Sequence, residues 1–140
     1  MQKLVIDTNV LVSALISRSY PAKIIEEIML GGVAQLILTA TIWSEYLDVL
    51  HRDKFARFPN FRRNADLVLL GLDERALWVT PTQRIALLSD ADDDQFLEAA
   101  VAGQADYLIT GNTNDFTLSV IQTTRIVTPA DYWQHHRSQT

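Results

Sequence analysis

The sequence predicts an α/β protein, a three-layer α/β/α sandwich with a central parallel sheet of about five strands. Short apolar segments typical of strands alternate along the chain with segments whose apolar residues recur at helical spacing. Each strand-like segment is apolar without interruption, which is typical of parallel strands that helices cover on both faces. The 140 residues contain no repeat, low-complexity tract or linker, so a single domain spanning 1–140 is expected.

The strand-like segments are separated by turn or helix signals. They are residues 4–6, 36–38, 77–79, 107–109 and 126–127. Between the first two, Pro21 sits where a first helical turn accepts proline, and Gly31 stops that helix. After the second strand, Thr41 is expected to cap a helix that runs to about Leu50.

The composition changes near the middle of the chain. Residues 51–64 interleave basic residues with phenylalanines, which predicts a loop or a broken helix before helical patterning returns at 67–72. The acidic stretch 90–94 then opens a helix that Gly103 closes, and a short helix around 132–133 follows the last strand. The tryptophans occupy helix or strand positions and are expected in the core; they are Trp43, Trp78 and Trp133.

Composition excludes several classes of function. Without cysteine, the chain has no disulfide, no cysteine nucleophile and no thiolate zinc site. Its longest apolar runs have four residues, against roughly 20 for a membrane-spanning helix, and its first residues lack the features of a secretory signal. A cytoplasmic protein that does not enter membranes is therefore expected. The net charge of −5 argues against a general polyanion binder but allows a nuclease whose acids hold cations.

Four carboxylates fall where this fold would bring them to one edge of the sheet. Asp7 directly follows the first strand and Asp115 follows the fourth by six residues, so both emerge at the same edge. Asp93 is near the start of the helix that leads into the fourth strand, and this start returns to that edge because the helix runs antiparallel to the strand. Glu45 lies on the helix after the second strand, at the border of its apolar stripe.

Like charges gathered in this way repel one another unless a cation compensates them. Oxygen ligands, the absence of cysteine and the lack of a well-placed histidine favour Mg²⁺ or Mn²⁺ over Zn²⁺. Such ions bind phosphate, and a pair roughly 3.5–4 Å apart can clamp the attacking and leaving oxygens of a phosphodiester. The four acids therefore suggest a metal-dependent phosphodiesterase.

Five short motifs follow one another along the chain. They are VIDTNVL at 5–11, TIWSE at 41–45, DADDDQFL at 90–97, ADYLITGN at 105–112 and NDF at 114–116. In this order and spacing the sequence resembles the PIN-domain ribonucleases over nearly its whole length. The resemblance is to the single-domain bacterial and archaeal branch that supplies toxin components of toxin–antitoxin pairs.

The resemblance implies Mg²⁺- or Mn²⁺-dependent hydrolysis of RNA phosphodiester bonds by metal-activated water, which leaves a 5′-phosphate and a 3′-hydroxyl. By position, the catalytic metal-binding acids correspond to Asp7, Glu45, Asp93 and Asp115, and the supporting residues to Asn9, Thr110 and Asn112. A toxin of a type II pair also implies a cognate antitoxin protein as partner, and the family commonly forms homodimers. Ala91 stands where proline is frequent and Asn112 where an acid is frequent, which leaves open whether one or two ions bind.

Several of these residues also have simpler interpretations. Asp7 would serve as a helix cap, and Glu45 as a solvated residue at a helix border. Asp115 would stabilise a turn. Asp90 is the main alternative to Asp93 as a ligand, although the acids that surround Asp93 are typical of capping and helix-dipole positions.

A basic and aromatic segment carries five of the twelve bases, at Arg52, Lys54, Arg57, Arg62 and Arg63. These side chains would neutralise RNA phosphates while an exposed phenylalanine stacks on a base. Alternatively, the segment is a solvated loop whose phenylalanines pack on the core. The sequence leaves both interpretations open.

Two other functions are compatible with parts of the sequence. A receiver domain has a similar size and an acidic Mg²⁺ pocket, but it needs a phospho-accepting aspartate after the third strand, where Pro81 stands. The alternative to the ribonuclease is a PIN-like module with weak or no catalysis, which binds RNA or a partner protein.

Overall fold

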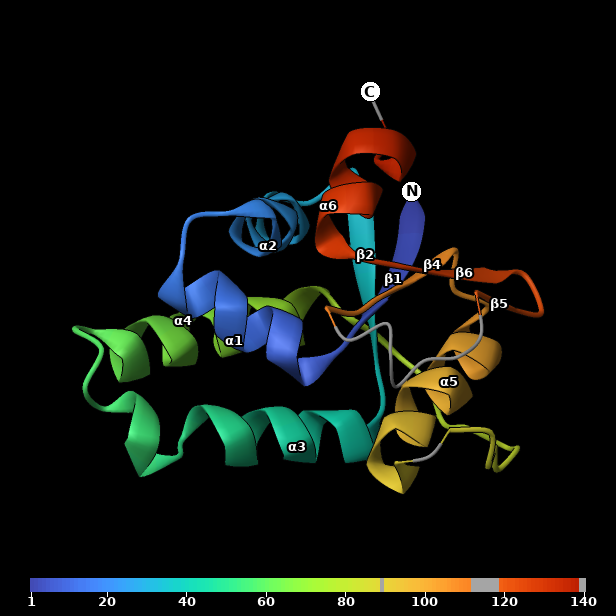
Figure 1. The fold of residues 1–140 in the computed structure, drawn as a ribbon, viewed down its shortest axis with the longest axis horizontal. Coiled ribbons are helices and arrows are strands. Elements are labelled where there is room, and N and C mark those ends of the chain that lie inside the picture. Colours follow the sequence, from blue (N-terminus) through green and yellow to red (C-terminus); the bar gives the residue numbers. More distant parts are fainter. Residues whose placement is uncertain (89, 112–118, 139–140) are drawn as a thin grey trace.

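The computed structural model describes residues 1–88, 90–111 and 119–138. Within this part of the chain, six strands form one sheet and helices flank it (Figure 1). In chain order the elements are β1 (Gln2–Ile6), α1 (Thr8–Ile16), α2 (Tyr20–Leu30), β2 (Ala34–Leu38), α3 (Ala40–Leu50), the 3-10 turn η1 (Asp53–Phe55), α4 (Phe61–Arg75), β3 (Leu77–Trp78), α5 (Ala91–Gly103), β4 (Tyr107–Ile109), β5 (Val120–Ile121), β6 (Thr124–Val127), α6 (Pro129–Asp131) and the π-helical turn η2 (Tyr132–His136).

The helices form layers on either side of the sheet. α2 and α4 contact β2 from one side, together with α1, which packs against both of them. α5 contacts β1, β2 and β4 from the other side (Figure 1). The predicted three-layer α/β/α architecture is therefore confirmed.

The strand order is β3-β2-β1-β4-β6-β5, and all neighbouring strands are parallel except β5 and β6. From β1 the chain moves outward to β2 and β3, and then returns to place β4 on the other side of β1. The strand order thus reverses between β1 and β4. Ligands of open α/β sheets bind beyond the carboxyl ends of the strands at such a switch point, which here lies next to Asp7 and Thr110.

The five strands predicted from the sequence are all present, with bounds that differ by at most two residues. The strand β5, which has two residues, was not predicted. It forms an antiparallel hairpin with β6, and the turn between them contains Gln122 at a φ of 50°.

Two helix starts differ from the prediction. Thr39 caps α3 in place of Thr41: its hydroxyl oxygen accepts a hydrogen bond from the Ile42 backbone nitrogen at 3.1 Å, directly after β2 leaves the sheet. The helix α4 begins at Phe61, after Asn60 at a φ of 60°. Residues 61–66 are therefore helical, and the break in the predicted segment is confined to the residues before them.

The phenylalanines of this segment pack against the protein. Phe55 and Phe61 are buried and stack with their ring centroids 4.8 Å apart, and Phe58 is half-buried beside Phe61. The core position predicted for Trp78 is wrong, because β3 is an edge strand and leaves this side chain 44% exposed. Trp78 contacts the half-buried Trp43 edge to face, with centroids 5.7 Å apart.

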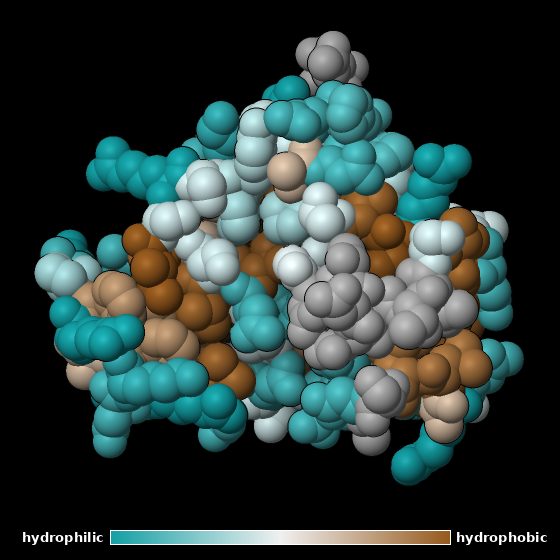
Figure 2. Space-filling model, viewed as in Figure 1, coloured by the Kyte–Doolittle hydropathy of each residue, from teal (hydrophilic) through white to brown (hydrophobic). Residues whose placement is uncertain are grey.

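The core lies between the sheet and its helices, and the side chains of residues 4–6 in β1 are at most 1% exposed. Some apolar side chains stay at the surface, and Figure 2 shows them over α1 and α4. A cavity of about 140 Å³ between α1, α2 and α4 is lined in part by Leu11, Leu15 and Ile25. None of the described helices combines the length and apolar character needed to cross a membrane.

Candidate functional site

Asp7 is a buried carboxylate at the switch point of the sheet. It is the first residue after β1 and is only 4% exposed. One of its oxygens accepts a hydrogen bond from the Asn9 backbone nitrogen at 3.2 Å, which caps α1. The other accepts from the hydroxyl of Thr110, which follows β4, at 2.8 Å. These two bonds fix the Asp7 carboxylate between the ends of neighbouring strands.

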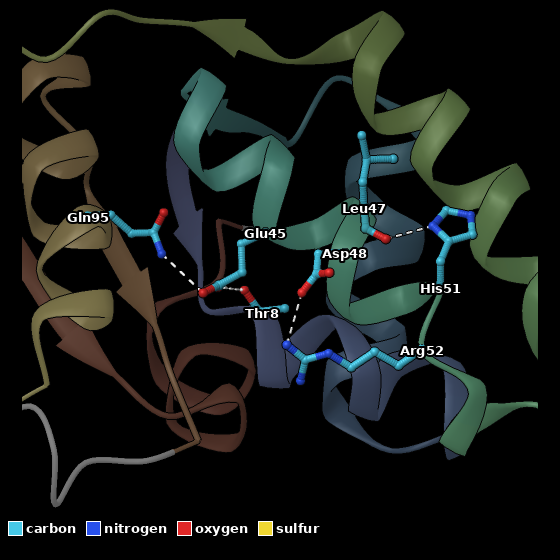
Figure 3. A network of polar contacts seen from close by, with 7 residues as sticks. All are labelled: Thr8, Glu45, Leu47, Asp48, His51, Arg52 and Gln95. Atoms are coloured by element: carbon cyan, nitrogen blue, oxygen red, sulfur yellow. Dashed lines mark hydrogen bonds and ion pairs between the residues drawn. The ribbon is translucent and has the colours of Figure 1, made fainter.

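Glu45 approaches the same edge from α3. Its Oε2 accepts a hydrogen bond from the Thr8 hydroxyl, directly after Asp7 in the chain. Its Oε1 accepts from the amide nitrogen of Gln95 on α5 at 3.2 Å. Figure 3 shows Thr8 and Gln95 reaching this carboxylate from different elements. The structure therefore brings Asp7 and Glu45 to the same edge of the sheet, linked through the single residue Thr8.

Tyr46 lies beneath these two carboxylates. Its ring is completely buried, and its hydroxyl donates a hydrogen bond to the Ile6 carbonyl oxygen at 2.5 Å. Burial, followed by the negative charges of Asp7 and Glu45, raises the pKa of Tyr46 well above its usual range. The phenol thus stays protonated and holds α3 against the end of β1.

The aspartates at the start of α5 make different contacts. Asp90 caps the helix by accepting a hydrogen bond from the Asp92 backbone nitrogen at 2.9 Å. Asp94 is 6% exposed and accepts from the backbone nitrogens of Leu87 and Leu88 at 3.2 and 2.9 Å. Asp93 is the half-buried acid between them. Asp90 thus serves as the helix cap and Asp94 binds the preceding loop, while the choice of Asp93 as a ligand stays a prediction.

Two surface cavities meet beside Glu45. One, of about 630 Å³, lies between α3 and the start of α5 and includes Glu45 and Arg52 in its lining. The other, of about 600 Å³, extends along the loop before α5 and includes Arg84. Thr41, Asp92 and Gln95 line both. The two cavities therefore adjoin each other along these shared residues.

The predicted basic segment is exposed at all five positions, which are Arg52, Lys54, Arg57, Arg62 and Arg63. Arg52 pairs with Asp48 at 3.0 Å at the edge of the larger cavity (Figure 3). Lys54 and Arg57 lie over the rings of Phe55 and Phe58, at 5.1 and 5.0 Å from their centroids. Arg62 donates to the His51 carbonyl oxygen at 3.0 Å, and Phe55 and Phe61 are buried and do not offer a stacking surface.

The remaining predicted residues are placed as follows. Thr110 bonds Asp7 through its hydroxyl, whereas Asn9 does so through its backbone and has an exposed side chain. Asn112 and Asp115 lie outside the described residues. Within residues 1–88, 90–111 and 119–138, no group of three or more histidine, aspartate and glutamate side chains is assembled to hold an ion.

The sequence did not reveal Thr8 and Gln95 as partners of Glu45, or Tyr46 as the residue beneath it. Thr8 belongs to the polar cluster after the first strand, which was a usable signal. Gln95 carries no such signal, because its role depends on how α5 packs beside α3.

Comparisons with known proteins agree with this architecture. A solved structure of VapBC2 from Rickettsia felis, bound to a DNA fragment from their promoter, matches with a TM-score of 0.58 and 12% identity, over 91% of this chain and 98% of that chain. A structure of VapBC-1 from nontypeable Haemophilus influenzae matches with a TM-score of 0.52 and 17% identity, over 83% and 91%. No curated protein matches the sequence. The family model described as PIN domain matches residues 3–114, well over half of the chain, and the protein therefore belongs to the PIN-domain family.

Proposed function

We propose that the protein is a divalent-metal-dependent endoribonuclease that hydrolyses RNA phosphodiester bonds and acts as the toxin of a type II toxin–antitoxin pair. One observation carries the proposal: Asp7 and Glu45, from different elements, are drawn together through Thr8 where the strand order reverses. A buried charge beside a second like charge costs stability unless a ligand compensates it. Membership of the PIN-domain family supports the same reading.

The donor set fits a hard divalent cation. Asp7 and Glu45 offer carboxylate oxygens, which Mg²⁺ and Mn²⁺ prefer. We expect Asp93 and Asp115 to complete the set. When bound, the ion supplies a polarised water for hydrolysis and neutralises charge on the phosphate.

The residues around these acids hold them in place. Thr110 and the Asn9 backbone fix the orientation of Asp7, and Thr8 fixes one oxygen of Glu45. Tyr46 keeps its proton and ties α3 to the last carbonyl of β1. Carboxylates held in fixed orientations in this way support the proposal, because a catalytic site needs side chains with locked orientations.

The RNA strand would lie in the two joined cavities beside Glu45. Arg52 lies at one side and Arg84 at the other, where each would neutralise a phosphate. The other bases of the segment 52–63 extend this positive surface. Base stacking on Phe55 or Phe61 is not part of the proposal, because both rings are buried.

Cleavage of single-stranded RNA tests the proposal. The purified protein is expected to cut RNA in the presence of Mn²⁺ or Mg²⁺, to leave 5′-phosphate ends, and to stop in EDTA. Asp7→Asn and Glu45→Gln are each expected to lower the rate by at least about 100-fold. The control Asp73→Asn changes an exposed acid of α4 and should leave the rate unchanged. Cleavage that persists in EDTA would exclude the metal-dependent mechanism.

The partner and the location belong to the same proposal. The two similar structures are VapBC assemblies, which supports a cognate antitoxin protein as partner. We expect a cytoplasmic protein, a chain that forms one domain, and a homodimer. Co-expression with the protein encoded next to it, followed by size-exclusion chromatography, tests both the partner and the dimer.

A further inference from the structure

Both oxygens of the Glu45 carboxylate are held from outside α3. Thr8, at the start of α1, donates to Oε2, and Gln95, in the second turn of α5, donates to Oε1. Figure 3 shows the carboxylate between the two donors. The terminal torsion of a glutamate is broad when nothing holds it. Two donors from two helices therefore determine the orientation of this carboxylate.

The orientation of the Gln95 amide follows from its neighbours. Its nitrogen donates to Glu45 Oε1 at 3.2 Å and to the Asp92 carbonyl oxygen at 2.8 Å. Both of these atoms can only accept hydrogen bonds, so the amide nitrogen and not the amide oxygen must face them. The amide nitrogen therefore donates to the Glu45 carboxylate and to the backbone of its own helix.

This arrangement leaves the other end of the amide unsatisfied. The Gln95 Oε1 atom is buried and has no hydrogen-bond partner in the described part of the chain. A buried acceptor without a partner destabilises the folded state. Gln95 therefore donates to the Glu45 carboxylate and to its own helix while its oxygen lacks a partner among the described residues, which indicates a residue kept for its contact with Glu45.

We propose that Gln95 is a positioning residue that, together with Thr8, orients the Glu45 carboxylate for metal binding. The inference rests on the proposed function, in which Glu45 is a ligand. Because Gln95 lies two residues after Asp93, its bond to Glu45 also joins the start of α5 to α3. The bond thus fixes the position of the proposed ligand Glu45 relative to the start of α5, where the proposed ligand Asp93 lies.

Replacement of Gln95 by methionine tests the role. Methionine has a similar length and shape but cannot donate to Glu45. The affinity for Mn²⁺, measured by calorimetry, is expected to fall about 10-fold or more, as is typical when the hydrogen-bond partner of a metal ligand is lost. The melting temperature without metal should change little, because removal of the unsatisfied oxygen offsets the loss of the two hydrogen bonds that the amide donates. Gln134→Met, at an exposed glutamine of η2, is the matched control.

A double-mutant cycle with Glu45→Gln separates positioning from a general effect on the fold. If Gln95 acts through the Glu45 carboxylate, Gln95→Met should weaken Mn²⁺ binding in the wild-type background and change it less than two-fold in the Glu45→Gln background. An equal loss in both backgrounds, or no loss in either, would overturn the inference.

The cycle also distinguishes the inference from the function on which it rests. If Glu45→Gln weakens Mn²⁺ binding and Gln95→Met does not, only the role of Gln95 is wrong. If the wild-type protein binds no Mn²⁺, or Glu45→Gln leaves binding unchanged, Glu45 is not a ligand and both proposals are wrong.

Discussion

Replacement of Asp7 by asparagine separates a metal-binding role from a structural one. Asp7 is 4% exposed and accepts hydrogen bonds from the Asn9 backbone and the Thr110 hydroxyl. Asparagine has the same shape, and its carbonyl oxygen caps a helix about as well as a carboxylate does. The Thr110 hydroxyl can turn and accept a hydrogen bond from the amide. The substitution therefore removes one negative charge while both of these hydrogen bonds can be replaced.

The effect of Asp7→Asn on the free energy of unfolding depends on whether metal is present. In EDTA, Asp7→Asn is expected to be more stable than the wild type by about 1 kcal/mol, because relief of a buried charge outweighs two weakened hydrogen bonds. At a free Mn²⁺ concentration 100 times the dissociation constant, binding stabilises the wild type by about 2.7 kcal/mol. For a chain of this size, that is roughly 10 °C in melting temperature. The variant, which lacks a ligand, should gain almost nothing.

Thermal and urea unfolding, each in EDTA and in Mn²⁺, measure both effects. The order of stability of the two proteins is expected to invert when metal is added. A variant that is already less stable in EDTA would show that the Asp7 charge serves the fold. Equal stabilisation of both proteins by Mn²⁺ would show that the ion binds elsewhere. Asp7→Ala, which also loses the helix cap and so about 1 kcal/mol, calibrates the structural contribution.

Three further outcomes follow from the described structure. Urea unfolding should show that Thr39→Ala lowers the free energy of unfolding by about 1 kcal/mol while Thr41→Ala changes it by less than about 0.5 kcal/mol; equal losses would contradict the cap at Thr39. Gly103→Ala places a Cβ atom 2.6 Å from Ile37 Cδ1 and should cost about 1–3 kcal/mol, whereas a Cβ at Gly111 meets none of the described residues within 4 Å and Gly111→Ala should cost much less. Burial raises the pKa of Tyr46 and of Tyr132, so both phenols keep their protons above about pH 10, where the tyrosines of the unfolded chain lose theirs. The free energy of unfolding should therefore fall above pH 10 by about 1.4 kcal/mol per pH unit for each of the two; Tyr46→Phe should reduce this slope, and an unchanged slope in urea titrations at pH 9 to 11 would refute the assignment.

The fold was predictable because its parallel strands are buried on both faces and so leave short, continuous apolar segments in the sequence. Features that depend on where a strand ends could not be predicted from the sequence. Thr39 and Thr41 are both suitable caps, and only the point at which β2 leaves the sheet decides between them. Trp78 is apolar in a strand, yet it is exposed because β3 has no strand beyond it.

The site was predictable to the extent that topology determines it. A residue directly after β1 must emerge at the switch point, where Asp7 lies, and the apolar stripe of α3 has Glu45 at its border; their role as metal ligands stays a prediction. The donors that hold these carboxylates belong to the packing of α1, α3 and α5 against one another. Sequence periodicity gives no information on that packing, so Gln95 was missed.

The run of four aspartates in residues 90–94 looks interchangeable on paper. Successive residues of a helix point about 100° apart, however, since one turn takes 3.6 residues. The Asp90 carboxylate accepts a hydrogen bond from the Asp92 backbone nitrogen, and the Asp94 carboxylate accepts from those of Leu87 and Leu88. Insertion or deletion of a single residue between Asp90 and Asp92 would rotate every later carboxylate toward a different neighbour. The helix cap and the bonds from Asp94 to the preceding loop would then be lost together, even though the acidic composition was preserved.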